Sequence, residues 1–176
     1  MAIVGNERRY GLVAQALHWV TAILVLAAWL IAGSWGRGGE DSAVMMAHQT
    51  IGFTVFVLVL VRLVWRLFDT RPGEPPMPAA MALAARVSHW LLYGLLLAVP
   101  LSAIVGTQLE GDALRIYGQA VGPYVDQSRK LGHEILEYHE LMATALIWLA
   151  GLHAAAAIFH HVVLRDRTLR QMLPAG

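Results

Sequence analysis

The chain of 176 residues contains no cysteine. This absence excludes disulfide bonds, metal sites built on thiolates, iron–sulfur clusters and the C-x-x-C-H attachment of a covalently bound haem. Any redox group that the protein carries must therefore be held by other side chains.

Charged residues are also scarce. They make up 14% of the chain, whereas ordinary globular domains contain about 25%. Hydrophobic residues account for 57%, and the mean hydropathy is positive. The net charge is only +1, and the basic residues form no stripe, so nucleic acid is not an expected partner. The composition predicts a membrane protein surrounded by lipid.

Four segments are long and apolar enough to span a bilayer, which requires about 20 mostly apolar residues. They cover residues 13–33, 48–68, 87–109 and 139–164. The first begins some way into the chain and is followed by further spans, so we interpret it as a retained helix and not as a cleaved signal peptide. We expect one all-α domain over residues 1–176, a transmembrane four-helix bundle.

The placement of arginine and lysine predicts the orientation of this bundle. One side carries eight arginines, namely Arg8, Arg9, Arg66, Arg71, Arg86, Arg165, Arg167 and Arg170. The other side carries Arg37, Arg115, Arg129 and Lys130. Both termini are therefore predicted to face the cytoplasm. The inner link "DTRPGEPPMPAA" is too rich in proline to be helical throughout, and the outer segment 110–137 is long enough to hold a short surface helix.

Histidines inside the predicted spans are the most informative residues, because polar side chains in a bilayer usually mark a functional site. His139 and His153 are 14 residues apart, which places them about 40° apart around one helix and roughly 21 Å apart along it. Each needs a partner at its own depth. His48 opens the second span at the level of His139, and His18 lies in the inner half of the first span, level with His153.

Two facing imidazoles suit six-coordinate iron in a haem plane, since bundle cores build cofactor sites from facing helices and histidine is a regular axial ligand of haem. Arg62 lies 14 residues beyond His48, on nearly the same helix face but at the inner level. No acid in the spans is placed to pair with it. A haem propionate is the expected partner, with Arg66 as a second, more exposed one.

Other interpretations of these residues stay open. A single intramembrane histidine could simply hydrogen-bond a neighbouring helix, and Arg62 could extend to the inner interface. A zinc site is disfavoured because zinc usually takes four ligands at one point. Gly52, Gly94 and the alanines at 154–157 allow the close approach of either a flat macrocycle or another helix.

His160 follows His153 by seven residues and lies on almost the same face, closer to the cytoplasm. We interpret it as the residue that exchanges protons beside a quinone, although it could instead compete with His153 as a ligand opposite His18. Trp19 is a candidate for the wall of the quinone pocket, with packing in the interfacial aromatic belt as the alternative.

The remaining histidines have less specific interpretations. His133 lies among acids in the outer segment and is expected to be a solvated surface residue. His89 is expected in the interfacial belt beside Trp90. His161 points away from the face that carries His153 and His160, and it is also expected at the interface. The sequence assigns no role to His89 or His161.

Several motifs of the chain resemble those of the bacterial cytochrome b561 family of di-haem, four-helix membrane proteins. They are "ALHW" in the first span, "AHQTIG" and "VRLVWRL" in the second, "SHWLLYGLLLAVPLSAIVG" in the third, and "YHE" with "GLHAAAAIFHH" in the fourth. The resemblance implies an inner b haem on His18 and His153 and an outer one on His48 and His139. It further implies an electron shuttle of the bacterial inner membrane that links an outer-face donor to ubiquinone, and some members oxidise superoxide.

The outer charges do not favour an anionic donor such as superoxide. The four basic residues of that side, of which Arg129 and Lys130 are nearest to His139, face eight acids. These are Glu40, Asp41, Glu110, Asp112, Asp126, Glu134, Glu137 and Glu140. A positive funnel would instead favour capture of an anion.

Two other functions stay open. The same fold serves as the cytochrome b anchor subunit of hydrogenases and formate dehydrogenases, so a redox subunit is a candidate partner, although the short tails offer it little docking surface. A helical transporter with structural histidines is the remaining alternative.

Overall fold

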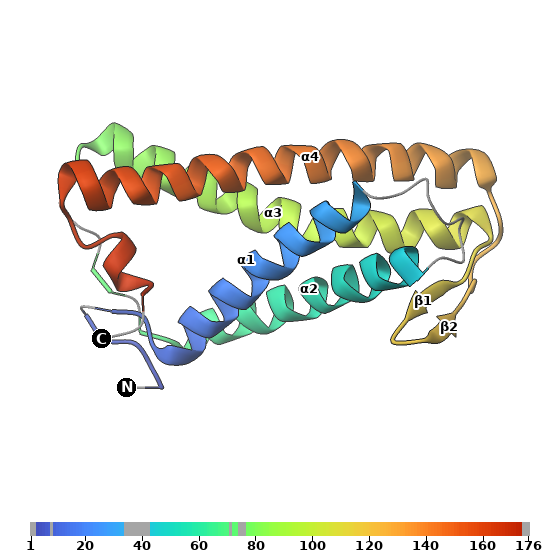
Figure 1. Cartoon of the computed structure of the whole chain (residues 1–176), viewed down its shortest axis with the longest axis horizontal. Coiled ribbons are helices and arrows are strands. Elements are labelled where there is room, and N and C mark those ends of the chain that lie inside the picture. The colour runs from blue at the N-terminus through green and yellow to red at the C-terminus, as the bar shows by residue number, and fades with distance from the viewer. Residues whose placement is uncertain (1–2, 8, 34–42, 71, 74–76, 174–176) are drawn as a thin grey trace.

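The structure, a computed structural model, describes residues 3–7, 9–33, 43–70, 72–73 and 77–173. Four helices dominate it (Figure 1), each long and apolar enough to cross a membrane. They are α1 (Leu12–Ala32), α2 (Ala43–Phe68), α3 (Ala79–Glu110) and α4 (Arg129–Phe159). A π-helical turn, η1 (His160–Leu164), continues α4, and a short 3₁₀ helix, η2 (Leu169–Gln171), follows. The predicted all-α membrane bundle is confirmed.

All four helices start earlier than the predicted spans, α1 by only one residue. Helix α2 begins at Ala43 instead of residue 48, α3 at Ala79 instead of 87, and α4 at Arg129 instead of 139. A helix satisfies its own backbone hydrogen bonds, so it continues through the interface into water without cost to the backbone. The alanine-rich start of α3 has strong helix propensity in addition.

The outer segment has room for a short surface helix, but residues 114–121 form a β-hairpin instead. Strand β1 (Leu114–Ile116) pairs antiparallel with β2 (Gln119–Val121), with Ile116 opposite Gln119. The two residues between them, Tyr117 and Gly118, have φ values of 51° and 79°. Positive φ at both central positions is typical of a type I′ turn, which matches the twist of paired strands. The rest of the segment joins the start of α4.

The hairpin is fixed to the outer part of α2 by three hydrogen bonds. The Arg115 backbone N–H donates to Gln49 Oε1 over 2.7 Å, and the Tyr117 N–H donates to Thr50 Oγ1 over 3.1 Å. The Tyr117 hydroxyl lies 2.7 Å from Thr54 Oγ1. The hairpin therefore borders the outer end of the space between the helices.

The bundle consists of two helical hairpins. Helices α1 and α2 pack closely along their lengths, as do α3 and α4, whereas the contacts of α2 with α3 and of α1 with α4 are fewer. The buried apolar core joins the two hairpins at one place, through Val55, Val59, Leu96 and Leu146. We call the boundary between the α1–α2 and α3–α4 hairpins the seam. It is the part of the bundle that helix packing leaves most open.

Both ends of the chain lie at the same end of the bundle (Figure 1). Three backbone segments meet there. The Tyr10 N–H donates to the Gln171 carbonyl over 3.2 Å, Gln171 Nε2 donates to the Gly73 carbonyl over 3.1 Å, and the Gly73 N–H donates to the Glu7 carbonyl over 3.2 Å. The N-terminal segment, the α2–α3 link and the C-terminal segment are thereby tied together.

The cytoplasmic orientation of this end stays a prediction from the arginine and lysine count. Some residues of that count and of the outer charge balance fall outside the described parts of the chain. They are Arg8, Arg37, Glu40, Asp41 and Arg71.

Helices α3 and α4 cross closely at Gly106 and Gly132, which gives a test of the packing. A Cβ on Gly132 would lie 2.7 Å from the Glu110 backbone nitrogen and 2.9 Å from the Gly106 carbonyl oxygen. We expect Gly132→Leu to force the helices apart and to cost about 1–3 kcal/mol of stability, measured by thermal unfolding in detergent. Gly151→Leu is the matched control, because a Cβ there meets no atom within 4 Å. Equal melting temperatures for the two variants would contradict this packing.

Candidate functional site

Four histidines face one another in two pairs across the seam. The ring centroids of His18 on α1 and His153 on α4 are 6.5 Å apart, and those of His48 on α2 and His139 on α4 are 6.3 Å apart. The structure therefore brings together the same histidines that were predicted to pair because they lie at the same depth. In each pair one hairpin supplies one ring and α4 of the other hairpin supplies the second.

The spacing within each pair leaves room for one metal ion. Two metal–imidazole bonds of roughly 2 Å, with about 1 Å from nitrogen to ring centre on each side, add up to about 6 Å. The pairs at 6.3 and 6.5 Å thus fit two axial ligands of one iron. The assignment of the four histidines as haem ligands stays a prediction.

Both outer rings are oriented by backbone carbonyl groups. His48 Nδ1 lies 3.0 Å from the Ala28 carbonyl oxygen, and His139 Nδ1 lies 2.8 Å from that of Val99. A carbonyl oxygen only accepts, so each Nδ1 carries the proton, and Nε2 of the neutral ring keeps its lone pair. Hydrogen bonds of this kind to the other ring nitrogen fix the tautomer of metal-binding histidines. Val99 directly precedes Pro100, the proline inside α3.

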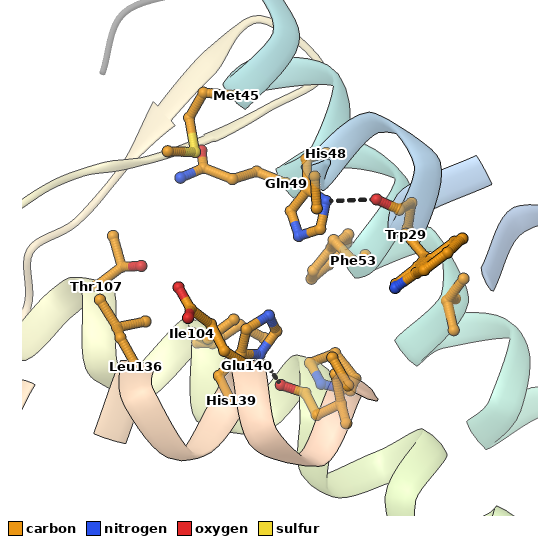
Figure 2. Close-up of a pocket in the computed structure, with 18 of the residues that line it drawn as sticks. Trp29, Met45, His48, Gln49, Phe53, Ile104, Thr107, Leu136, His139 and Glu140 are labelled. Atoms are coloured by element: carbon orange, nitrogen blue, oxygen red, sulfur yellow. Dashed lines mark hydrogen bonds between the residues drawn. The ribbon is translucent and has the colours of Figure 1, made fainter. Parts of the chain in front are cut away.

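A cavity of about 940 Å³ lies between the outer rings. Figure 2 shows His48 and His139 on its opposite walls, with the dashed bonds to the two carbonyl groups. Gly52 also lines it, and a Cβ at that position would meet no atom within 4 Å. Most of the lining is apolar, as in cofactor pockets generally. Its volume and its two facing imidazoles suit a flat macrocycle.

The charged residues that line this cavity differ from those that the sequence suggested. Arg129 and Lys130 were the nearest basic residues in sequence to His139, but neither belongs to the lining; Arg115 of the hairpin does. The acidic residues that line the same cavity are Glu110, Asp112 and Glu140. The signal that could have identified Arg115 was the turn pattern around Gly118, because the hairpin carries this arginine to the cavity.

The inner pair has a different environment, in which Arg62 contacts His18 itself. Arg62 Nη2 lies 3.1 Å from His18 Nδ1, and its guanidinium carbon lies 5.4 Å from the Tyr93 ring centroid. Arg66 also stacks on this ring and donates to the Tyr93 hydroxyl over 3.2 Å. Among the described residues no carboxylate forms an ion pair with Arg62. A haem propionate would supply the anionic partner that Arg62 lacks among these residues. The pairing of Arg62 with a propionate stays a prediction.

His89 was expected in the interfacial belt beside Trp90. In the structure its ring also lies against His153 of the inner pair. Its ring centroid is 5.3 Å from that of His153, with the ring planes at 70°. The inner level thus contains three imidazoles with Arg62 and Tyr93. Tyr93 follows His89 by four residues, which puts both on one face of α3, and this spacing was the available signal for their joint role.

His160 is held by an acid that the sequence did not single out. Its Nδ1 lies 2.5 Å from Asp166 Oδ2. Burial raises the pKa of Asp166, but hydrogen bonds from His160 and Thr168 outweigh this effect and leave the pKa below its usual value. The carboxylate is therefore ionised at neutral pH.

The other predicted residues lie as follows. Trp19 contacts His18, and its Nε1 donates to the Met172 carbonyl over 2.8 Å, so it packs under the C-terminal segment. His161 Nδ1 is buried without a hydrogen-bond partner among the described residues. The exposed His133 lies 3.6 Å from both Glu110 and Glu137, as a surface residue would.

Comparisons with known proteins give one consistent result. A family model described as prokaryotic cytochrome b561 matches residues 9–175. The chain is 30% identical over 172 residues to a Yersinia pestis protein named probable superoxide oxidase CybB, covering 96% of this chain and 97% of that protein. It is 33% identical over 163 residues to cytochrome b561 homolog 1 of Escherichia coli (strain K12), covering 90% and 93%, respectively. Homolog 2 of that strain is 28% identical over 187 residues, with 98% and 95% coverage.

The paired histidines give a direct test of the site. We expect His139→Ala to lose the outer haem and to keep the inner one, because each pair holds its group independently, so the haem content per chain falls by about half. His153→Ala should lose the inner haem instead. Haem is measured by the reduced-minus-oxidised spectrum per mole of chain. His133→Ala, an exposed histidine on the same helix, is the control and should lose none. Full haem content in both ligand variants would contradict the assignment.

Proposed function

This chain belongs to the prokaryotic cytochrome b561 family, and from this premise we propose that it passes electrons from a donor at the outer face to a membrane quinone. The family consists of membrane electron-transfer proteins that bind haem b. Four spanning helices place this member as a multi-pass protein in the bacterial inner membrane. The donor, the quinone and the number of haems belong to the proposal.

The observation that carries the proposal is the pair of imidazoles at each of two levels. The outer haem would be held by His48 and His139, and the inner one by His18 and His153, with Arg62 and Arg66 as partners for propionates. When bound, the two b haems supply one-electron carriers near the two faces of the membrane.

Superoxide is the candidate donor, because one relative is named a probable superoxide oxidase. The balanced reaction oxidises two superoxide anions to two molecules of oxygen and reduces one quinone with two protons to one quinol. Arg115 is the cationic group at the outer cavity, and three acids line the same cavity. Electrostatic attraction of the anion is therefore weak here, and the charge of the cavity does not by itself favour this donor.

At the inner face the chain itself must handle protons. Ubiquinone needs two protons as well as two electrons, and His160 lies on the cytoplasmic side of His153, where an imidazole can exchange protons near neutral pH. Trp19 lies against His18 and is the candidate wall of the quinone pocket.

Stopped-flow mixing with superoxide and then with ubiquinone tests this function. We expect superoxide to reduce the haem of the native protein and ubiquinone to reoxidise it. In His139→Ala, reduction by superoxide should slow at least about 100-fold, because the outer ligand is lost, whereas the inner haem, reduced by dithionite, should still be reoxidised by ubiquinone.

Two outcomes would contradict parts of this proposal. Unchanged reduction by superoxide in His139→Ala would exclude the outer pair as the entry point. Failure of ubiquinone to reoxidise the native protein would exclude a quinone as the acceptor.

A further inference from the structure

The end of α4 folds back on itself around His160. The helix widens into the π-turn η1, and Arg165 then reverses the chain with φ 54° and ψ 32°. This reversal brings Asp166 back to His160: the Asp166 N–H donates to the His160 carbonyl over 3.1 Å, and the two side chains meet. Non-glycine residues with positive φ carry a conformational cost, and π-turns are frequent at functional sites.

The Asp166 carboxylate is fixed through both of its oxygens. Oδ2 accepts from His160 Nδ1 over 2.5 Å, and Oδ1 accepts from the Thr168 backbone N–H over 2.8 Å. Both side chains are largely shielded, with exposed fractions of 12% for His160 and 23% for Asp166. An ionised carboxylate can only accept, so His160 Nδ1 carries a proton. Among the described residues none hydrogen-bonds His160 Nε2.

We propose that Asp166 is a positioning residue that presents His160 Nε2 as the proton-exchanging atom of the inner quinone site. This inference rests on the proposed function. For each electron that reaches the quinone from the outer donor, one proton leaves Nε2 of the protonated ring for a quinone oxygen, and the ring then takes up one proton from the solvent at the inner face. Two such events convert the quinone to quinol. Asp166 keeps its charge throughout and is not itself protonated.

The other charged groups near this dyad do not replace Asp166. The elements packed against η1 are α4 and η2. Helix α4 contributes His153, one of the inner ring pair, and η2 contributes Arg170. The segment itself carries His161, Arg165 and Arg167. In the part of the chain that the structure describes, none of these forms an ion pair with His160 or Asp166.

Asp166→Asn tests the proposal because an amide has nearly the same shape but can donate its N–H to Nδ1. The proton of the neutral ring then moves to Nε2, which can no longer accept one. We expect quinol formation by the haem-loaded protein to slow about 10- to 100-fold, a usual effect of losing the carboxylate that orients a functional histidine. The haem spectrum should not change, and the pH profile of the rate should shift. Asp166→Glu should restore part of the rate, whereas a purely structural turn would not require a carboxylate.

A second measurement reads the tautomer without using activity. In reduced protein labelled with ¹⁵N-histidine, the His160 resonances should show the proton on Nδ1 in the native chain and on Nε2 in Asp166→Asn. Asp126→Asn, which removes an exposed acid at the outer side, is the control and should change neither rate nor tautomer. A proton on Nε2 in the native chain, or a rate in Asp166→Asn equal to that of the control, would overturn the proposal.

His160→Gln distinguishes a failure of the positioning role of Asp166 from a failure of the proposed function. If His160→Gln leaves quinol formation unchanged, the inner proton site of the proposed function is wrong, and the role of Asp166 is overturned with it. If His160→Gln slows the reaction but Asp166→Asn does not, the proposed function stands and only the positioning role is overturned.

Discussion

Pairing of imidazoles across the seam is the interaction on which the rest of the structure depends. The helices pack closely within each hairpin and loosely between hairpins. His153 and His139 of α4 face His18 of α1 and His48 of α2 across this seam, beside the small apolar core that joins the hairpins. Lipid provides no hydrophobic force that would close such a seam. A flat group clamped between the rings would join the hairpins, and its binding energy would add to the stability of the bundle.

The two levels are built for different tasks. At the outer level, carbonyl groups of Ala28 and Val99 fix the tautomers of His48 and His139 in a mostly apolar cavity, which suits a site that only exchanges electrons. The inner level combines cationic, phenolic and imidazole groups around His18, with the His160–Asp166 dyad beyond it. Such groups can bind anionic propionates and exchange protons. This asymmetry agrees with an electron donor outside and a proton-consuming acceptor inside.

Sequence periodicity predicted the four helices and the histidine pairs, because hydropathy reports lipid contact and helix geometry converts residue spacing into depth. It missed features that depend on where the chain turns. The Tyr117–Gly118 turn carries Arg115 to the outer cavity, and the reversal at Arg165 brings Asp166 onto His160. The contact of His89 with His153 depends on how α3 rotates against α4, which apolar patterns alone do not determine.

The most direct test of haem binding between the paired histidines is the number and spin state of haems in the purified native chain. Haem quantitation per chain combined with electron paramagnetic resonance of the oxidised protein measures both. We expect two b haems per chain, each low-spin with two imidazole ligands. A chain with no haem, or iron in a high-spin state with a single imidazole, would contradict the pairing of histidines across the seam.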